Sequence, residues 1–104
     1  MGNGRELITN ENELFLQGVE KTRQGEQAGA IRVFVQVLQL NPEDANAYGH
    51  RCVARYRLGD DQGAIADCQQ AAVLYLAQGK TKEHHYALKM LQKLQPQQLR
   101  QTTL

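Results

Sequence analysis

The chain has 104 residues, of which 41% are hydrophobic and 22% charged, a composition that fits one small globular domain with a continuous core. Its formal net charge is only +1, with Lys and Arg spread along the chain, so we expect no nucleic-acid partner. The longest apolar run, 71–77, is far shorter than the roughly 20 residues that cross a bilayer, and the first residues lack an apolar signal core, so we expect a cytoplasmic protein that does not span a membrane.

Residues 1–10 are expected to form a flexible tail, because they combine glycines with only a short apolar pair. Asn10, followed by Glu13, is a typical helix start and predicts a first helix over about 11–24. Gly18 in the middle of this helix costs about 1 kcal/mol relative to Ala. Such a cost indicates a close crossing with another helix at this residue.

A second helix is predicted over about 27–39, after Gly25, which can end the first helix in a left-handed conformation. Its apolar surface is wider than one stripe and therefore needs cover on two sides. The residues of this surface are Ala30, Val33, Phe34, Val35, Val37 and Leu38. Because the part around Val33, Val35 and Leu40 could be buried against a second copy, a homodimer is an open alternative.

The third helix is predicted to have Asn41 as its cap and Pro42 as its first residue, and to run to about Leu58. Its expected inward residues are Tyr48, Cys52 and Arg55, with Gly49, Val53 and Tyr56 on the neighbouring face. After Gly59, a fourth helix is predicted to continue to Gln78. Asp60 and Asp61 at its start are interpreted as acids that complement the positive end of the helix dipole.

A fifth helix is predicted over 81–94, with Thr81 as its cap after Gly79, and Pro96 closes it. Its expected inward residues are Tyr86, Ala87, Met90, Leu91 and Leu94. His84 and His85 are adjacent, so they point about 100° apart on a helix and cannot both bind one metal ion. We expect both to face solvent, and residues 96–104 to form a polar tail.

The chain repeats itself after 34 residues: GEQAGAI at 25–31 returns as GDDQGAI at 59–65. A period of this size, with helices on both sides of a glycine turn, predicts stacked helix-turn-helix units. Ala30 and Ala64 each lie one turn into the second helix of a unit. Their small side chains are expected to let two helices approach closely.

These residues resemble the tetratricopeptide repeat. The family's pattern is filled in the first unit by Leu14, Gly18, Ala30, Phe34, Val37 and Pro42, and in the second by Tyr48, Cys52, Ala64, Cys68 and Ala71, with Leu76 in place of the closing proline. The resemblance implies an all-α, right-handed solenoid of about five antiparallel helices. It also implies a domain over 11–95, divided into repeat one at 11–44, repeat two at 45–78 and a capping helix at 81–94.

What the family implies for function is a concave groove that holds an extended peptide or a partner's helix. The groove positions are Asn12, Phe15, Val19, Thr22 and Arg23 from the first unit, Asn46, Gly49, Val53, Tyr56 and Arg57 from the second, and Glu83, Ala87 and Met90 from the capping helix. Phe15 and Val19 could instead pack against the capping helix or the tail. A clamp for a C-terminal carboxylate is disfavoured, because Phe15, Val19 and His50 occupy much of its place.

We find no motif for catalysis, metal binding or a cofactor, and therefore expect a non-enzymatic interaction module or small adaptor with a protein or peptide partner. Cys52 and Cys68 both point between the two helices of one unit. We expect free buried thiols there, since their spacing has no CxxC character and a cytoplasmic setting keeps thiols reduced. A disulfide or redox switch is the alternative.

Overall fold

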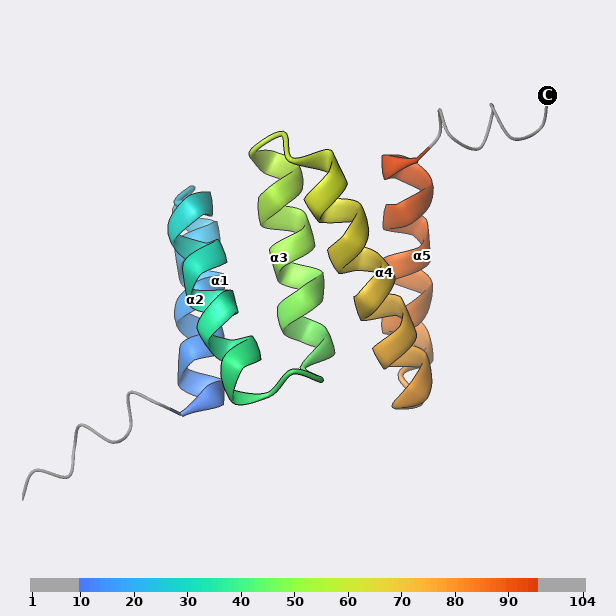
Figure 1. Ribbon diagram of the computed structural model, residues 1–104, viewed down its shortest axis with the longest axis horizontal. Helices are drawn as coiled ribbons and strands as arrows, with labels where there is room; N and C mark the ends of the chain where they lie inside the picture. Colours follow the sequence, from blue (N-terminus) through green and yellow to red (C-terminus); the bar gives the residue numbers. More distant parts are fainter. Residues whose placement is uncertain (1–9, 96–104) are drawn as a thin grey trace, which may run out of the picture.

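The computed structural model describes residues 10–95, which form five α-helices and no strand (Figure 1). The helices are α1 (Glu11–Arg23), α2 (Gln27–Leu40), α3 (Ala45–Arg57), α4 (Asp61–Ala77) and α5 (Thr81–Leu94). The predicted all-α helical repeat is therefore confirmed. Within the described range, none of the helices combines the length and apolar character that crossing a membrane requires. Of the predicted tails, 1–10 and 96–104, residues 1–9 and 96–104 lie outside the described residues, and Asn10 is the cap of α1.

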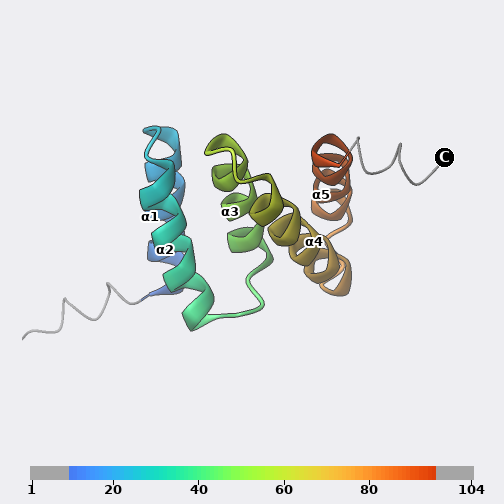
Figure 2. The same ribbon diagram turned by 45° about the horizontal axis from the view of Figure 1, so that its top comes forward.

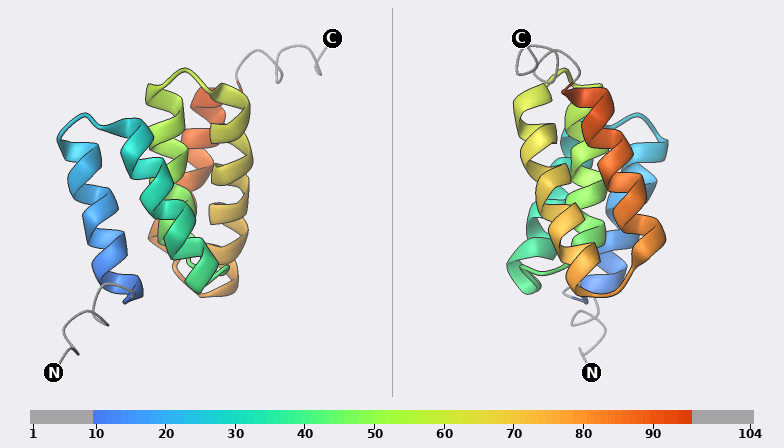
Figure 3. Two further views of the ribbon diagram at one scale, coloured as in Figure 1. Left: turned by 60° about the vertical axis from the view of Figure 1, so that its left-hand side comes forward. Right: turned by 90° about the vertical axis from the view of Figure 1, so that its right-hand side faces the viewer.

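Each helix packs against its neighbours in the sequence, and consecutive helices run in opposite directions. In the view of Figure 2, α1 and α2 overlap, and α3, α4 and α5 follow this pair across the molecule. Figure 3 shows the same stack obliquely and from its α5 end. The contact between α2 and α3 joins the first helix pair, α1 and α2, to the second pair, α3 and α4.

Three turns between helices share one geometry. Gly25, Gly59 and Gly79 have φ angles of 83°, 88° and 73°, a left-handed conformation that residues with a Cβ rarely adopt. At each turn the next residue's N–H donates to a carbonyl five residues earlier, as in Asp60 to Arg55 at 2.9 Å. The predicted helix ends at these glycines are confirmed.

Helices α1 and α2 cross closely at Gly18, as predicted. A Cβ added to Gly18 would lie 2.6 Å from Cε1 of Phe34, so only glycine leaves room for this ring. Phe34 is fully buried, as are Ala30 and Ala64. The first helix pair is thus built around a ring that lies against bare backbone.

The core consists of three clusters of buried side chains. The first contains Leu14, Ala30, Val33, Phe34, Val37 and Ala47; the second Ala45, Ala71, Ala72, Tyr75 and Ala87; the third Cys52, Ala64 and Cys68. Because Val33 belongs to the first cluster, it is not available to a second copy of the chain, contrary to one part of the homodimer prediction. Leu40 remains 50% exposed.

The third helix begins three residues later than predicted. Asn41 is not its cap: the Asn41 Oδ1 accepts from the N–H of Glu43 at 3.1 Å, which makes a local turn that includes Pro42. Asp44 is the cap instead, and its Oδ1 accepts from the N–H of Ala47 at 3.1 Å. The side chain of Asn41 thus accepts from a backbone amide of the loop and not from the first turn of α3.

The fifth helix differs from prediction in three side chains. Thr81 is its first residue and not its cap, because the glycine turn places the residue directly after Gly79 at the cap position. Tyr86 is 65% exposed and does not face the core. His84 is half-buried rather than exposed, since its Nδ1 lies 2.9 Å from the carbonyl oxygen of Ala72 on α4, whereas His85 is exposed as predicted.

Candidate functional site

A cavity of about 380 Å³ lies between α3, α4 and α5. It is lined by Asn46, Gly49, His50 and Val53 of α3, by Cys68 and Tyr75 of α4, and by Lys82, Glu83, Tyr86, Ala87 and Met90 of α5. The facing positions Gly49 and Ala87 carry little or no side chain, which leaves the space open. Pockets that bind small molecules have volumes of roughly 300–1,000 Å³, so this cavity lies within that range.

The polar groups of the cavity gather near Asn46. The hydroxyl of Tyr75 donates to Oδ1 of Asn46 at 2.6 Å. Burial, with a smaller effect from the charges of Glu83 and Asp44, raises the pKa of Tyr75 to about 12, so the hydroxyl keeps its proton at neutral pH. Since Oδ1 of Asn46 is occupied, the amide N–H groups of this side chain are left to donate to a ligand.

His50 connects the cavity to the first core cluster. Its Nδ1 lies 3.0 Å from the backbone oxygen of Asn46, and because a carbonyl only accepts, Nδ1 carries the hydrogen. The ring lies edge-on to Phe15, with centroids 5.0 Å apart, and 5.9 Å from Phe34. The two phenyl rings also contact each other, with centroids 5.9 Å apart, so both lie on one side of the imidazole, and Nε2 is the nitrogen left to a ligand.

The cavity brings together only part of the predicted groove. Asn46, Gly49 and Val53 from α3 line it together with Glu83, Ala87 and Met90 from α5. The other predicted positions, Asn12, Phe15, Val19, Thr22, Arg23, Tyr56 and Arg57, lie outside it. Thus the second helix pair and α5 form the site, whereas the α1 positions do not reach it.

Two of the α1 positions, Phe15 and Val19, have a packing role. Both lie against the first core cluster, which α2 dominates, rather than against α5. Arg23 is held by Glu20, with Nη1 and Oε1 2.6 Å apart, on an exposed surface. Tyr56 and Arg57 are exposed near the end of α3.

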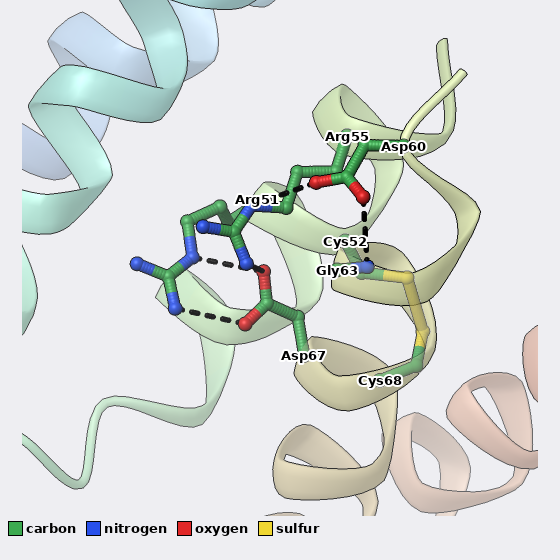
Figure 4. Close-up of polar contacts among 7 residues, drawn as sticks. All are labelled: Arg51, Cys52, Arg55, Asp60, Gly63, Asp67 and Cys68. Atoms are coloured by element: carbon green, nitrogen blue, oxygen red, sulfur yellow. Dashed lines mark hydrogen bonds and ion pairs between the residues drawn. A yellow bond between two sulfur atoms is a disulfide. The ribbon is translucent and has the colours of Figure 1, made fainter. Parts of the chain in front are cut away.

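Sequence reasoning missed a buried ion network between α3 and α4 (Figure 4). Arg51 donates to both oxygens of Asp67, from Nε and from Nη2, each at 2.8 Å. Arg55 adds a third bond from Nη1 at 3.2 Å, and Asp67 is only 3% exposed. The available signal was position: Asp67 lies between Ala64 and Ala71 on the buried stripe of α4, where an acid requires a partner.

Cys52 and Cys68 form a disulfide between α3 and α4, with their Cα atoms 5.6 Å apart (Figure 4). The expectation of two free thiols is therefore wrong. The helix pair brings the two positions face to face across its core, and this proximity does not depend on a CxxC spacing. Cys52 is fully buried, and Cys68 nearly so.

Two carboxyl groups meet where α1 and the loop before α3 come together. Burial first, and then a hydrogen bond with Glu11, raise the pKa of Asp44 to about 6. Hydrogen bonds from Asp44 and from Asn41 lower the pKa of Glu11. The Nδ2 of Asn41 donates to Glu11 at 3.0 Å. Below about pH 6, a proton held at Asp44 therefore links α1 of the first helix pair to the cap of α3.

No protein-family model matches the chain, but curated relatives do. Tetratricopeptide repeat protein 36 of Mus musculus is 34% identical over 73 residues, which cover 70% of this chain and 39% of that protein. The protein of the same name from Homo sapiens is 36% identical, with the same coverage, and that from Bos taurus is 38% identical over 65% of this chain and 36% of its own. The chain thus spans about two-fifths of the length of these relatives.

A solved structure agrees with the fold. The solution NMR structure of a tetratricopeptide repeat domain protein from Salinibacter ruber matches with a TM-score of 0.76, covering 84% of this chain and 88% of that one. At 16% identity this likeness shows the fold alone. Together with the curated relatives, it shows that the chain belongs to the tetratricopeptide repeat family, whose members serve in general as protein interaction modules.

Proposed function

We propose that this protein is a small adaptor without catalytic activity that binds a peptide or helix of a partner protein. In this proposal one large apolar side chain of the partner enters the cavity between α3, α4 and α5, while the rest of the segment follows the concave face. The observation that carries the proposal is the cavity itself, which joins three predicted groove residues of α3 to three of α5.

The chemistry of the lining supports an apolar anchor. Val53, Ala87 and Met90 offer apolar surface, and the free N–H groups of Asn46 suit a backbone carbonyl of the bound segment. At the rim, Lys82 and Glu83 carry opposite charges. Because these charges balance, we expect selection by the size of the apolar side chain rather than by the charge of the partner.

The test compares one substitution at two places. Val53→Phe fills the cavity, whereas Val73→Phe adds the same ring on the outer side of α4, where Val73 is 62% exposed. A random peptide library is panned on the wild-type protein. We expect enriched peptides to share one large apolar residue, and to lose about tenfold or more of their affinity for Val53→Phe but not for Val73→Phe. Equal binding by both variants, or no enrichment, would reject the proposal.

Self-association is the second candidate, and a different surface favours it. Leu40 of α2 is 50% exposed, on the surface where the sequence predicts contact with a second copy. A second copy of the chain could cover this face. Light scattering across the micromolar range tests the idea: a dimer that Leu40→Glu dissociates supports it, and a monomer throughout removes it.

A further inference from the structure

We infer that the cavity is the route by which a dithiol reaches the Cys52–Cys68 disulfide, with Sγ of Cys68 as the atom that it attacks. Cys68 lines the cavity and Cys52 does not. Two other hollows of the described surface, one along α2 and one beside Asp44, are lined by neither cysteine. Of the two sulfurs, the one on α4 is therefore open to a reagent that has entered the cavity.

The reaction is a thiol–disulfide exchange in two steps. A thiolate of the dithiol attacks Sγ of Cys68, the bond to Cys52 breaks, and Cys52 leaves as a thiolate that takes a proton. The second thiol of the reagent then displaces Cys68 from the mixed disulfide. In total, two electrons and two protons pass to the protein, and the dithiol leaves as a cyclic disulfide.

Met90 controls the entrance in this arrangement. Its side chain lines the cavity and also packs against the cluster of Cys52, Ala64 and Cys68. A methionine side chain is unbranched and changes its shape readily, so it can move without any change in the helix backbone. Shortening residue 90 should therefore open the path to Cys68, and enlarging Val53 on the opposite wall should close it.

The ion network limits what reduction does to the fold. Arg51 directly precedes Cys52, and Asp67 directly precedes Cys68, so the bidentate ion pair lies beside the disulfide and links the same two helices (Figure 4). When the sulfur bond breaks, this pair still holds α3 to α4. Reduction then changes the wall of a folded site rather than unfolding the protein.

A partner side chain and a dithiol cannot occupy the cavity together, a consequence that rests on the proposed function. A partner side chain in the cavity covers Cys68, so it protects the disulfide from the dithiol. If reduction changes the affinity for the partner by some factor, the partner must change the equilibrium of reduction by the same factor. The disulfide would thus report whether the adaptor is occupied.

The test measures the rate of reduction of the full chain by dithiothreitol, with alkylation and mass spectrometry to count free thiols. Compared with the wild type, we expect Met90→Ala to react about tenfold faster, Val53→Phe about tenfold slower, and Val73→Phe at nearly the wild-type rate. A wild-type chain that already has two free thiols before reductant is added would overturn the inference.

A second measurement separates entry through the cavity from global unfolding. Leu14→Ala removes a buried side chain from the first cluster, away from the disulfide, and lowers overall stability. We expect it to leave the reduction rate within about twofold of wild type. If its rate rises in step with its unfolding constant from urea titration, while Val53→Phe matches Val73→Phe, the inference is wrong. No partner is needed, so failure of the peptide screen leaves this result intact.

Discussion

The two helix pairs fill the same position of the repeat in different ways. In the first pair, Gly18 lies under the ring of Phe34, and the ring occupies the space between the helices. Thirty-four residues later the same two positions hold Cys52 and Cys68, which are joined by a bond. In the first pair a large buried side chain packs between the helices, whereas in the second a disulfide and an ion network join them. Because the second pair does not need a large side chain at this position, it can border a cavity.

The largest loss of stability is expected from the buried ring of the first pair. Phe34→Ala should lower the free energy of unfolding by about 3–5 kcal/mol, because it empties a fully buried site that backbone at Gly18 cannot fill. Urea titration followed by circular dichroism measures the change. Phe15→Ala, which removes a partly buried ring, is the control and should cost clearly less. Equal losses of stability in the two variants would mean that the contact between Phe34 and Gly18 adds nothing to stability.

The second-largest loss of stability is expected from the ion network of the second pair. Asp67→Ala should cost roughly 3 kcal/mol, since it leaves Arg51 partly buried without its carboxylate and leaves Arg55 only the more exposed Asp60, 3.8 Å away. Glu20→Gln breaks the exposed pair with Arg23 and should change stability by no more than about 0.5 kcal/mol. The same urea titration compares the two. A small effect at Asp67 would contradict its role in linking α3 and α4.

The disulfide should contribute slightly less than the buried ion network. A double variant, Cys52→Ala with Cys68→Ala, is expected to lose roughly 2–3 kcal/mol, because the bond closes a loop with a sequence separation of 16. Thermal melting with and without dithiothreitol measures this: the reductant should lower the melting temperature of the wild type only. If the melting temperature of the wild type did not change once both cysteines were reduced, the ion network alone would hold this pair.

The smallest effect concerns the junction between the pairs and depends on pH. The folded pKa of Asp44 is raised from 3.8 to about 6, so its stabilising effect is complete below about pH 4 and is lost as pH rises through 6. The lowered pKa of Glu11 acts in the opposite direction below about pH 4.5. Between pH 4.5 and 6.5 we therefore expect stability to fall by on the order of 1 kcal/mol as pH rises.

Asp44→Asn tests this assignment, because asparagine keeps the capping oxygen but does not titrate. Melting temperatures at several pH values between 4.5 and 6.5 should vary less in this variant than in the wild type. An unchanged slope would assign the pH dependence to other groups.

Local signals in the sequence predicted the helices well. Gly25, Gly59 and Gly79 end helices for a reason that lies within a few residues, so their turns could be anticipated. The cap at Asn41 failed because its side chain can bond any of several nearby amides, and the choice depends on how the loop is held by Glu11, thirty residues away. Local chemistry offered alternatives that only the tertiary contacts decide.

The site was harder to predict than the fold. The repeat pattern predicts Asn46, Gly49 and Val53 as groove positions, and these three line the cavity. It predicts the same role for the α1 positions, which lie outside the cavity. Whether Phe15 faces a ligand or the core depends on Phe34 and His50, which come from two other helices. The pairing of Asp67 with Arg51 and of Cys52 with Cys68 likewise requires distances between helices, and spacing along one chain does not supply them.

A single helix contributes to all three core clusters: α3 supplies Ala47 to the first, Ala45 to the second and Cys52 to the third. A string of independent hairpins would melt in steps, one hairpin at a time. Here the loss of α3 would remove a buried side chain from each of the three clusters at once. The described part of the chain should therefore melt in one calorimetric transition, and the first helix pair should not persist when the chain is cut after it, because the cut removes Ala47 from its cluster.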